Sequence, residues 1–241
     1  MDRLQTKGLT KVYHQVNVVD GINLEFKTGK ISALLGRNGA GKTTTFLMMA
    51  GIVKPDSGDV VFNGENVNHI PSYERSQKGL IYLPQQHSIF MKATVFQNLF
   101  MVLELYHSQT EARQKALALL GDFGLQAVQD SKAHQLSGGE KRRLEIARSM
   151  IMAPRFLFLD EPFTGIDPIT IHELQKVILK LKRRGIGIII TDHNVKDTFF
   201  ITDMAYIIHK GHILSCGTPA QVVKEEETRQ VFLGKDFEWN G

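Results

Sequence analysis

The sequence predicts an α/β fold in which strands and helices alternate, and three features of the 241-residue chain support this prediction. A short apolar run at 31–35 leads into a glycine-rich loop and then into an apolar stretch without Gly or Pro, which is the order strand, loop, helix. Further apolar runs at 79–83, 156–159 and 187–190 are typical of buried strands. By contrast, residues from about 88 to 150 show helical spacing only, so we expect a helical insertion.

The N-terminal part of the chain predicts antiparallel strands. Residues 3–9 and 22–27 have strand patterns and are separated by a turn near Asp20-Gly21. A strand at 59–62 followed by Asn63-Gly64 predicts a hairpin, because this dipeptide favours the tight turns that join antiparallel strands. We therefore expect an N-terminal antiparallel β subdomain beside the α/β core.

We expect one domain over residues 1–241, because the chain shows no internal repeat, low-complexity segment or linker. Within it, residues 1–87 and 153–241 would form the core together with the β subdomain. Residues 88–152 would form the inserted helical subdomain. The helical spacing there predicts helices over 94–106, over 110–123 and up to Met152.

Composition is that of an ordinary globular protein, with 42% hydrophobic and 22% charged residues. The net charge of +4 is small, so it favours a solvated surface over a nucleic-acid partner. A single cysteine, Cys216, excludes a disulfide within the chain and suits a reducing compartment. The N-terminus lacks a signal peptide's apolar run, and no stretch approaches the roughly 20 apolar residues that span a bilayer. We therefore expect membrane contact only through a partner.

The loop after residue 35 matches the phosphate-binding pattern G-x-x-x-x-G-K-[ST]. Its glycines let backbone N–H groups surround phosphates, and the helix N-terminus adds the positive end of its dipole. Lys42 would contact the β- and γ-phosphates of a bound nucleotide, and the Thr43 hydroxyl would bind Mg²⁺. The alternative is a chance match in a glycine-rich turn. The expected nucleotide-binding residues are Gly36, Arg37, Asn38, Gly39, Ala40, Gly41, Lys42, Thr43 and Thr44.

Four polar residues follow the other apolar runs, where ligands bind at the carboxyl ends of strands in such sheets. Asp160 is placed to hold Mg²⁺, and Glu161 would polarise the attacking water as general base. His193 would hydrogen-bond the γ-phosphate, and Gln85 would bind Mg²⁺ or the water through its amide oxygen. Without the phosphate-binding loop, each of these residues would have an ordinary structural explanation, such as a helix cap or a surface position.

Ser137, Gly138 and Gly139 precede another predicted helix. A Ser hydroxyl and glycine N–H groups at a helix N-terminus form a second anion site. The helical insertion carries this site away from the first loop, so a second copy of the chain would have to bring it to the same phosphates. The alternative is a plain helix cap and turn.

In their order along the chain, these residues resemble the ATP-binding subunits of ABC transporters, and the resemblance covers essentially the whole sequence. Its most specific element is the signature Leu136-Ser-Gly-Gly-Glu140. The family implies a P-loop NTPase core of the RecA type and an ATP-hydrolysing motor. It also implies a head-to-tail homodimer with two ATP molecules between the copies. Ser137 and Gly139 of one copy would then contact the γ-phosphate held by the other.

The resemblance also assigns roles to single residues. It implies that Tyr13 stacks on adenine. Without the resemblance, Tyr13 would be interpreted as a half-buried strand residue. It implies that Gln85 forms the Q-loop, that Asp167 lies in the D-loop and that His193 is the switch histidine. Two positions depart from the family pattern: Arg37 replaces the usual proline, and Glu140 replaces the commoner Gln. We expect nucleotide binding to survive both changes.

A finer resemblance is to the ATPases of lipopolysaccharide-export (Lpt) systems, and it extends beyond the catalytic motifs. The stretches that carry it are 82–90, 160–168, 190–195 and the tail at 229–237. It implies transmembrane permease partners and a place on the cytoplasmic face of the bacterial inner membrane. The ATPases of branched-chain amino-acid importers share much of the rest and are the alternative.

Phe90 and Met91 follow the Q-loop, and we hypothesise that they line a groove for a permease helix. The alternative is that both side chains pack inside the helical subdomain. Soluble ABC proteins that act on DNA or ribosomes usually carry two cassettes or a long coiled coil. This chain has one P-loop, one signature and no heptad run, so we favour a transport motor without nucleic acid. A nucleotide-binding regulator without turnover conflicts with the presence of Glu161 and His193.

Overall fold

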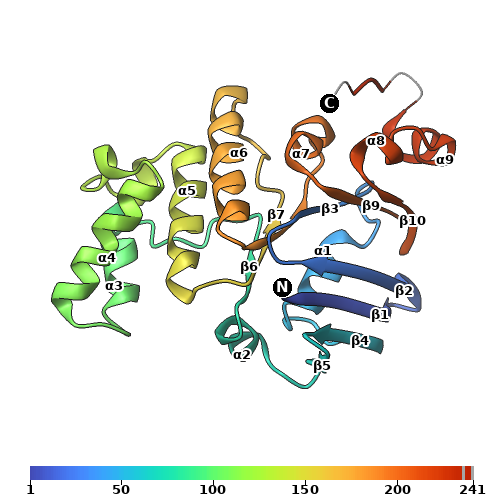
Figure 1. Ribbon diagram of the computed structural model, residues 1–241, viewed down its shortest axis with the longest axis horizontal. Helices are drawn as coiled ribbons and strands as arrows, with labels where there is room; N and C mark the ends of the chain where they lie inside the picture. The colour runs from blue at the N-terminus through green and yellow to red at the C-terminus, as the bar shows by residue number, and fades with distance from the viewer. Residues whose placement is uncertain (235–236, 240–241) are drawn as a thin grey trace.

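The computed structural model describes residues 1–234 and 237–239, which form two β-sheets with helices around them (Figure 1). A six-stranded sheet has the order β10-β9-β3-β8-β7-β6, and a four-stranded sheet has the order β2-β1-β4-β5. The helices α3, α4 and α5 lie at the opposite end of the molecule from the four-stranded sheet (Figure 1). The sequence-based prediction of an α/β fold is confirmed.

The six-stranded sheet is parallel except for its last strand. Its strands are β3 (Ile31–Leu35), β6 (Leu80–Leu83), β7 (Phe156–Asp160), β8 (Gly187–Thr191), β9 (Met204–His209) and β10 (His212–Gly217). Strands β3, β7 and β8 are buried at every residue, as expected for parallel strands covered on both faces. Because neighbouring parallel strands end at one edge, the residues after β3, β6, β7 and β8 are brought together there.

The four-stranded sheet is antiparallel, and its first turn differs from the prediction. Its strands are β1 (Arg3–Tyr13), β2 (Val16–Lys27), β4 (Ser57–Phe62) and β5 (Glu65–Asn66). The β1–β2 turn lies at His14-Gln15 rather than near Asp20-Gly21, with positive φ at both turn residues, as tight hairpins require. Gly21 instead lies inside β2, where a φ of +63° accompanies irregular pairing with β1.

The three helices predicted between 94 and 152 are present, with small shifts at their ends. The α-helices of the described residues are α1 (Lys42–Met49), α2 (Ser72–Gln77), α3 (Val95–Leu103), α4 (Gln109–Asp122), α5 (Gly138–Ser149), α6 (Pro168–Arg183), α7 (Val195–Ile201), α8 (Pro219–Val222) and α9 (Glu226–Thr228). The helix predicted over 94–106 ends at Leu103. The helix predicted from Thr110 begins one residue earlier, because Ser108 caps it together with Glu111. The third helix ends at Ser149, and a 3₁₀ turn continues to Met152.

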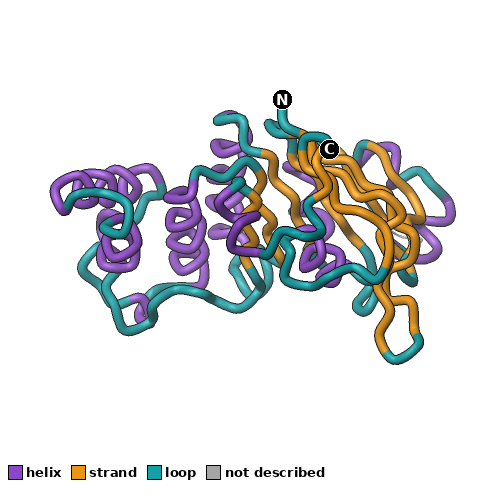
Figure 2. The backbone as a smooth tube through the Cα atoms, turned by 90° about the horizontal axis from the view of Figure 1, so that it is seen from below, coloured by secondary structure: helices purple, strands orange, loops and turns teal. Residues whose placement is uncertain are grey.

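Two apolar clusters lie on opposite faces of the six-stranded sheet. Alternate side chains of β7 point to opposite faces of the sheet and belong to different clusters. Phe158 packs with Phe46 of α1, whereas Leu157 and Leu159 belong to a cluster that includes residues of α3–α6. This second cluster includes residues of the sheet and of the helices α3–α6. Figure 2 shows a group of helices at one end of the molecule, beside the strands. Between β6 and β7, the described residues form helices and turns but no strand. The exact subdomain boundaries at 88 and 152 stay a prediction.

The tail packs against α7 through described residues that include Phe237 and Trp239. Lys235 and Asp236, which belong to the tail that carries the finer resemblance, lie outside the described residues. Within the described ranges, no helix combines the length and the apolar character needed to cross a membrane.

Candidate functional site

The phosphate-binding loop connects β3 to α1 and depends on glycine at two close contacts. A Cβ at Gly36 would lie 2.2 Å from the Ile208 carbonyl oxygen. Gly41, with a φ of +107°, would place a Cβ 2.5 Å from the Val18 carbonyl oxygen. The loop and the first turn of α1 line a pocket of about 250 Å³, and Glu161 lines it from the other side.

Lys42 is buried at the start of α1, and its ammonium is held over the loop. Its Nζ donates to the carbonyl oxygens of Gly36 at 2.8 Å and Arg37 at 3.1 Å. Burial lowers the pKa of Lys42, although the carboxylates of Glu161, Asp160 and Asp192 act in the opposite direction. A bound polyphosphate would supply the nearby negative charge that this buried cation favours.

Asp160, the last residue of β7, is buried and its carboxylate is fixed by three hydroxyl groups. It accepts hydrogen bonds from Thr191 at 2.5 Å, Tyr82 at 2.9 Å and Thr43 at 3.5 Å. Burial and the nearby Asp160 carboxylate raise the pKa of Tyr82, so its hydroxyl stays a donor. Thr43 and Asp160 thus place two oxygens side by side, a donor set that suits a hard cation such as Mg²⁺.

Glu161 lies at the centre of the polar contacts around the pocket. Its Oε2 accepts hydrogen bonds from Gln85 Nε2 at 2.8 Å and Thr164 Oγ1 at 3.1 Å, and lies 3.5 Å from His193 Nδ1. Its backbone has a φ of +47°, a conformation that is uncommon for a non-glycine residue and is found at functional sites as well as in turns. The structure therefore brings together Gln85, Glu161 and His193, as the sequence predicted.

Sequence analysis missed three residues that hold this arrangement. Tyr82 and Thr191 orient Asp160, and Thr164 Oγ1 lies 3.3 Å from His193 Nδ1 as well as contacting Glu161. The sequence around Tyr82 has only the pattern of a buried strand, so it does not indicate that the Tyr82 hydroxyl contacts a site residue. Pairing of β6 with β7 and of β7 with β8 is what places Tyr82 and Thr191 beside Asp160.

Asp192 is fully buried next to His193 and fixes two loops of the site. Its carboxylate accepts hydrogen bonds from the backbone N–H of Phe163 at 2.8 Å and of Asn194 at 2.9 Å. Burial raises the pKa of Asp192. These bonds join the loop after Glu161 to the loop that carries His193.

Ser137, Gly138 and Gly139 lie apart from the phosphate-binding pocket. Ser137 caps α5 in a reciprocal capping box with Glu140. Gly138 lines a separate pocket of about 80 Å³, together with Gln85 and Glu161 among others. These residues therefore do not line the phosphate pocket of their own chain. That they contact the phosphates bound by a second copy stays a prediction.

Tyr13, Phe90 and Met91 lie on the surface. Tyr13, at the end of β1, is 41% exposed, and the Lys11 ammonium lies 5.4 Å from its ring centre. Phe90 and Met91 are 48% and 39% exposed, so neither is enclosed in the helical segment. The Arg148 guanidinium lies 5.2 Å from the Phe90 ring. Stacking of Tyr13 on adenine and docking of a partner at Phe90 stay predictions.

A family model described as "ABC transporter" matches residues 19–164 of the chain. Proteins named lipopolysaccharide export system ATP-binding protein LptB are similar over nearly the whole length. The Acidithiobacillus ferridurans protein is 46% identical over 98% of both chains. The Haemophilus influenzae protein is 44% identical, and the Escherichia coli K12 protein 41%, each over 98% of this chain and 99% of the relative.

Solved structures show the same fold. A nucleotide-free ATP-binding cassette from an ABC transporter superposes with a TM-score of 0.87 at 24% identity, covering 98% of this chain and all of the other. The cbiO1 protein of Clostridium perfringens, part of the complex cbiONQ, has a TM-score of 0.84 at 29% identity, over 94% and 92% of the two chains. A dimeric bacterial cassette, MJ0796, has a TM-score of 0.78 at 23% identity, over 89% and 98%.

Proposed function

The chain belongs to the ATP-binding subunits of ABC transporters, and on that premise we propose that it is the motor of a lipopolysaccharide-export system. Members of this family bind ATP and hydrolyse it to ADP and phosphate, and this chain is such an ATPase. The observation that carries the finer proposal is the full-length similarity to proteins named for lipopolysaccharide export, at 41–46% identity.

We propose that the residues around the loop divide the reaction between them. The loop's N–H groups and Lys42 bind the phosphates and neutralise their charge. Thr43 and Asp160, with Gln85 as a further oxygen donor, would hold Mg²⁺, which supplies charge neutralisation at the phosphates when bound. Glu161, held by Gln85 and near His193, accepts the proton of the attacking water.

The proposed working unit is a head-to-tail dimer of two copies. Ser137 and Gly139 do not line the phosphate pocket of their own chain, so each site lacks a second anion-binding element unless a second copy supplies one. In the dimer, the N-terminus of α5 of one copy would meet the γ-phosphate bound by the other. Adenine would stack on Tyr13, which is exposed and available to a ligand.

The permease partner is proposed to dock where the helical segment 88–152 meets the α/β core, at Phe90 and Met91. Exposed apolar side chains held in place are typical of docking surfaces. The position of Phe90 is fixed, because Asn98 accepts from its backbone N–H at 2.8 Å and donates to its carbonyl at 3.0 Å. In this proposal the subunit works on the cytoplasmic face of a bacterial inner membrane and contacts the membrane only through the permease.

Purification of the Glu161→Gln variant with ATP from detergent-solubilised membranes, followed by mass spectrometry, tests the proposal. Export permeases for lipopolysaccharide are the expected partners. An amino-acid permease would move the assignment to a branched-chain amino-acid importer and leave the ATPase mechanism unchanged. Ribosomal or DNA-repair proteins without a permease would overturn the transport proposal.

The Phe90→Ala variant tests the docking surface separately. We expect ATP hydrolysis by the isolated subunit to stay within about twofold of the unmodified protein, because Phe90 is exposed and does not line the phosphate pocket. Copurification with the permease should be lost. Retained copurification would contradict a docking role for Phe90.

A further inference from the structure

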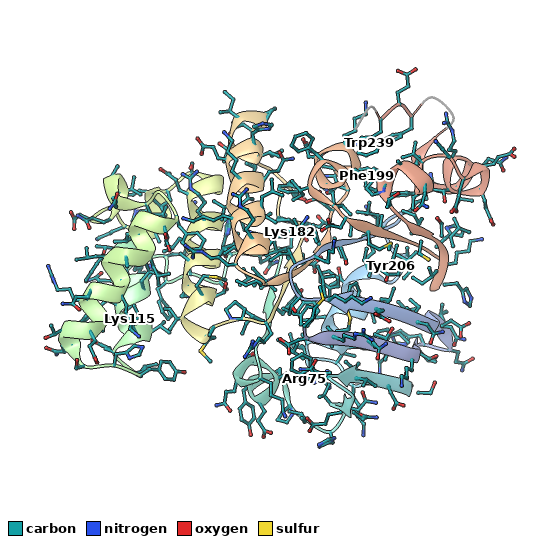
Figure 3. The ribbon with its side chains drawn as sticks, in the orientation of Figure 1. Arg75, Lys115, Lys182, Phe199, Tyr206 and Trp239 are labelled. Carbon is teal, nitrogen blue, oxygen red and sulfur yellow. The ribbon has the colours of Figure 1, made fainter. Side chains whose placement is uncertain are left out.

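A buried arginine outside the ATP site has no assigned role. Arg75, on α2, is 1% exposed and projects into the molecule (Figure 3). Burial lowers the pKa of Arg75 to about 10. Among the described residues, no carboxylate forms an ion pair with it, so another group must compensate the cost of burying its charge.

The groups that compensate Arg75 are backbone carbonyls, two of them at the end of α1. Nη1 of Arg75 donates to the carbonyl oxygens of Met48 and Met49, both at 2.8 Å, and Nε donates to Ile70 at 3.0 Å. Met48 and Met49 are the last residues of α1, where the dipole is negative and the carbonyls lack the usual helical partners, although the Gly51 N–H also donates to the Met48 carbonyl at 3.1 Å. Arg75 therefore caps the helix that follows the phosphate-binding loop.

Gly51 leaves the space that this contact needs. It has a φ of +76°, and a Cβ there would lie 2.6 Å from Arg75 Nε and 2.9 Å from Cδ. Glycine is thus required by the backbone conformation and by the guanidinium together. The fit defines one position for Arg75 against the end of α1.

The other end of α1 carries Lys42 and Thr43. Because α1 has eight residues, the two ends are about 12 Å apart. The dipole of α1 is therefore favourable at both ends: its positive N-terminal end faces the phosphates, and its negative C-terminal end faces Arg75. The chain after Arg75 also continues through β6 to Gln85, which contacts Glu161.

We propose that Arg75 is a positioning residue for ATP binding: it fixes the C-terminal end of α1 so that Lys42 and Thr43 meet the phosphates at the other end. Arg75 does not line the phosphate pocket, so its effect on ATP would pass through the helix. By thermodynamic linkage, ATP binding and the Arg75 cap should strengthen each other.

The test compares the dissociation constant of Mg-ATP for the Glu161→Gln protein with and without Arg75→Gln. Glutamine keeps a hydrogen-bond donor but removes the charge, and we expect ATP to bind about tenfold more weakly. Arg75→Lys retains the charge and should restore most of the affinity. Ser76→Ala on the same helix, which removes a bond to the Ser72 carbonyl, is the matched control and should leave affinity unchanged.

A structural role alone would give a different pattern. If Arg75→Gln lowers the melting temperature but leaves the dissociation constant unchanged, the proposal is overturned. In the background with Glu161 intact, KM for ATP should rise while kcat stays within about twofold. If Arg75→Gln does not fold, Gly51→Ala displaces the guanidinium and keeps its charge. ATP affinity equal to that of the unmodified protein in that variant would equally overturn the proposal.

Discussion

The phosphate-binding loop packs against backbone carbonyls of the strands β2 and β9, whereas the segment after Gln85 is held by side chains of α5. In the loop, Gly36 and Gly41 approach carbonyl oxygens so closely that no side chain fits. After Gln85, the Ser88 N–H donates to Glu145 Oε1 at 2.7 Å, and Arg148 donates to the Ser88 carbonyl at 2.5 Å. The first loop therefore depends on its glycines, and the second segment depends on the side chains of α5.

The segment around Gln85 is connected through α5 to the strand that carries Asp160. Arg142 donates to the Pro84 carbonyl at 2.9 Å, to Glu145 Oε2 at 3.0 Å and to the Asp160 carbonyl at 3.2 Å. One buried guanidinium thus touches both the segment that leads to Phe90 and the strand that carries Asp160. The comparison teaches that the phosphate-binding loop and the segment that leads to Phe90 are held by different elements, the strands β2 and β9 for the loop and α5 for the segment.

The largest effect is expected from a change that separates chemistry from phosphate binding. Glu161→Gln removes the proposed base but keeps a side chain that Thr164 and Gln85 can contact. ATP turnover should fall by at least about 100-fold, because a general base contributes that much or more. The Mg-ATP dissociation constant, measured by fluorescence, should stay within about threefold, since Lys42 and the loop are unchanged. Normal turnover would show that another group is the base.

A smaller effect is expected at the signature, where two neighbouring glycines differ. A Cβ at Gly139 would lie 1.9 Å from Thr170 Cγ2, whereas at Gly138 the nearest atom outside the helix is 3.8 Å away. Gly139→Ala must move α5 away from α6, at a cost of about 1–3 kcal/mol in the free energy of unfolding. Urea unfolding measures this cost. Gly138→Ala should leave the isolated subunit as stable as before.

The same pair of variants sharpens the dimer proposal. Gly138 is exposed, and a Cβ there would approach atoms of its own chain only to ordinary contact distances. A methyl group would therefore obstruct a second copy rather than the chain itself. We expect Gly138→Ala to bind ATP normally but to dimerise less with ATP in the Glu161→Gln background, as measured by size-exclusion chromatography. Unchanged ATP-dependent dimerisation would contradict the head-to-tail arrangement at this residue.

A site residue could be predicted from the sequence when it belongs to a local sequence pattern or follows a recognisable strand. The phosphate-binding loop is contiguous and its glycines are visible as a pattern, so residues 36–44 could be identified directly. Asp160, Glu161 and His193 could be placed because strand ends meet at one edge of the sheet. Tyr82 and Arg75 could not, because their partners lie 78 and about 27 residues away and neither position has a distinctive local pattern. The β1–β2 turn was misplaced because His14 and Gln15 are unusual turn residues, whereas Asp20-Gly21 is a common one.

The smallest effect is expected where the helical segment contacts α6 at the surface. Asp122, the last residue of α4, lies 3.1 Å from Lys180 Nζ and 2.8 Å from Arg184 Nη2. These hydrogen bonds, that of Arg184 first, lower the pKa of Asp122 below its ordinary 3.8. Because the groups are partly exposed and screened by water, Asp122→Asn should cost only about 0.5 kcal/mol near neutral pH.

The pH dependence of this cost has a defined sign. A carboxyl whose pKa is lower in the folded protein stabilises it above the unfolded pKa of 3.8, and loses that contribution as pH falls through the folded pKa. The melting-temperature difference between the unmodified protein and Asp122→Asn, about 1–2 °C near neutral pH, should therefore shrink in acid. It should also shrink at about 1 M salt, where surface charges are screened. A difference that grows in acid would mean that Asp122 does not act through its charge. In that case the helical segment would depend on the apolar cluster it shares with α6, and on α5, for its attachment to the core.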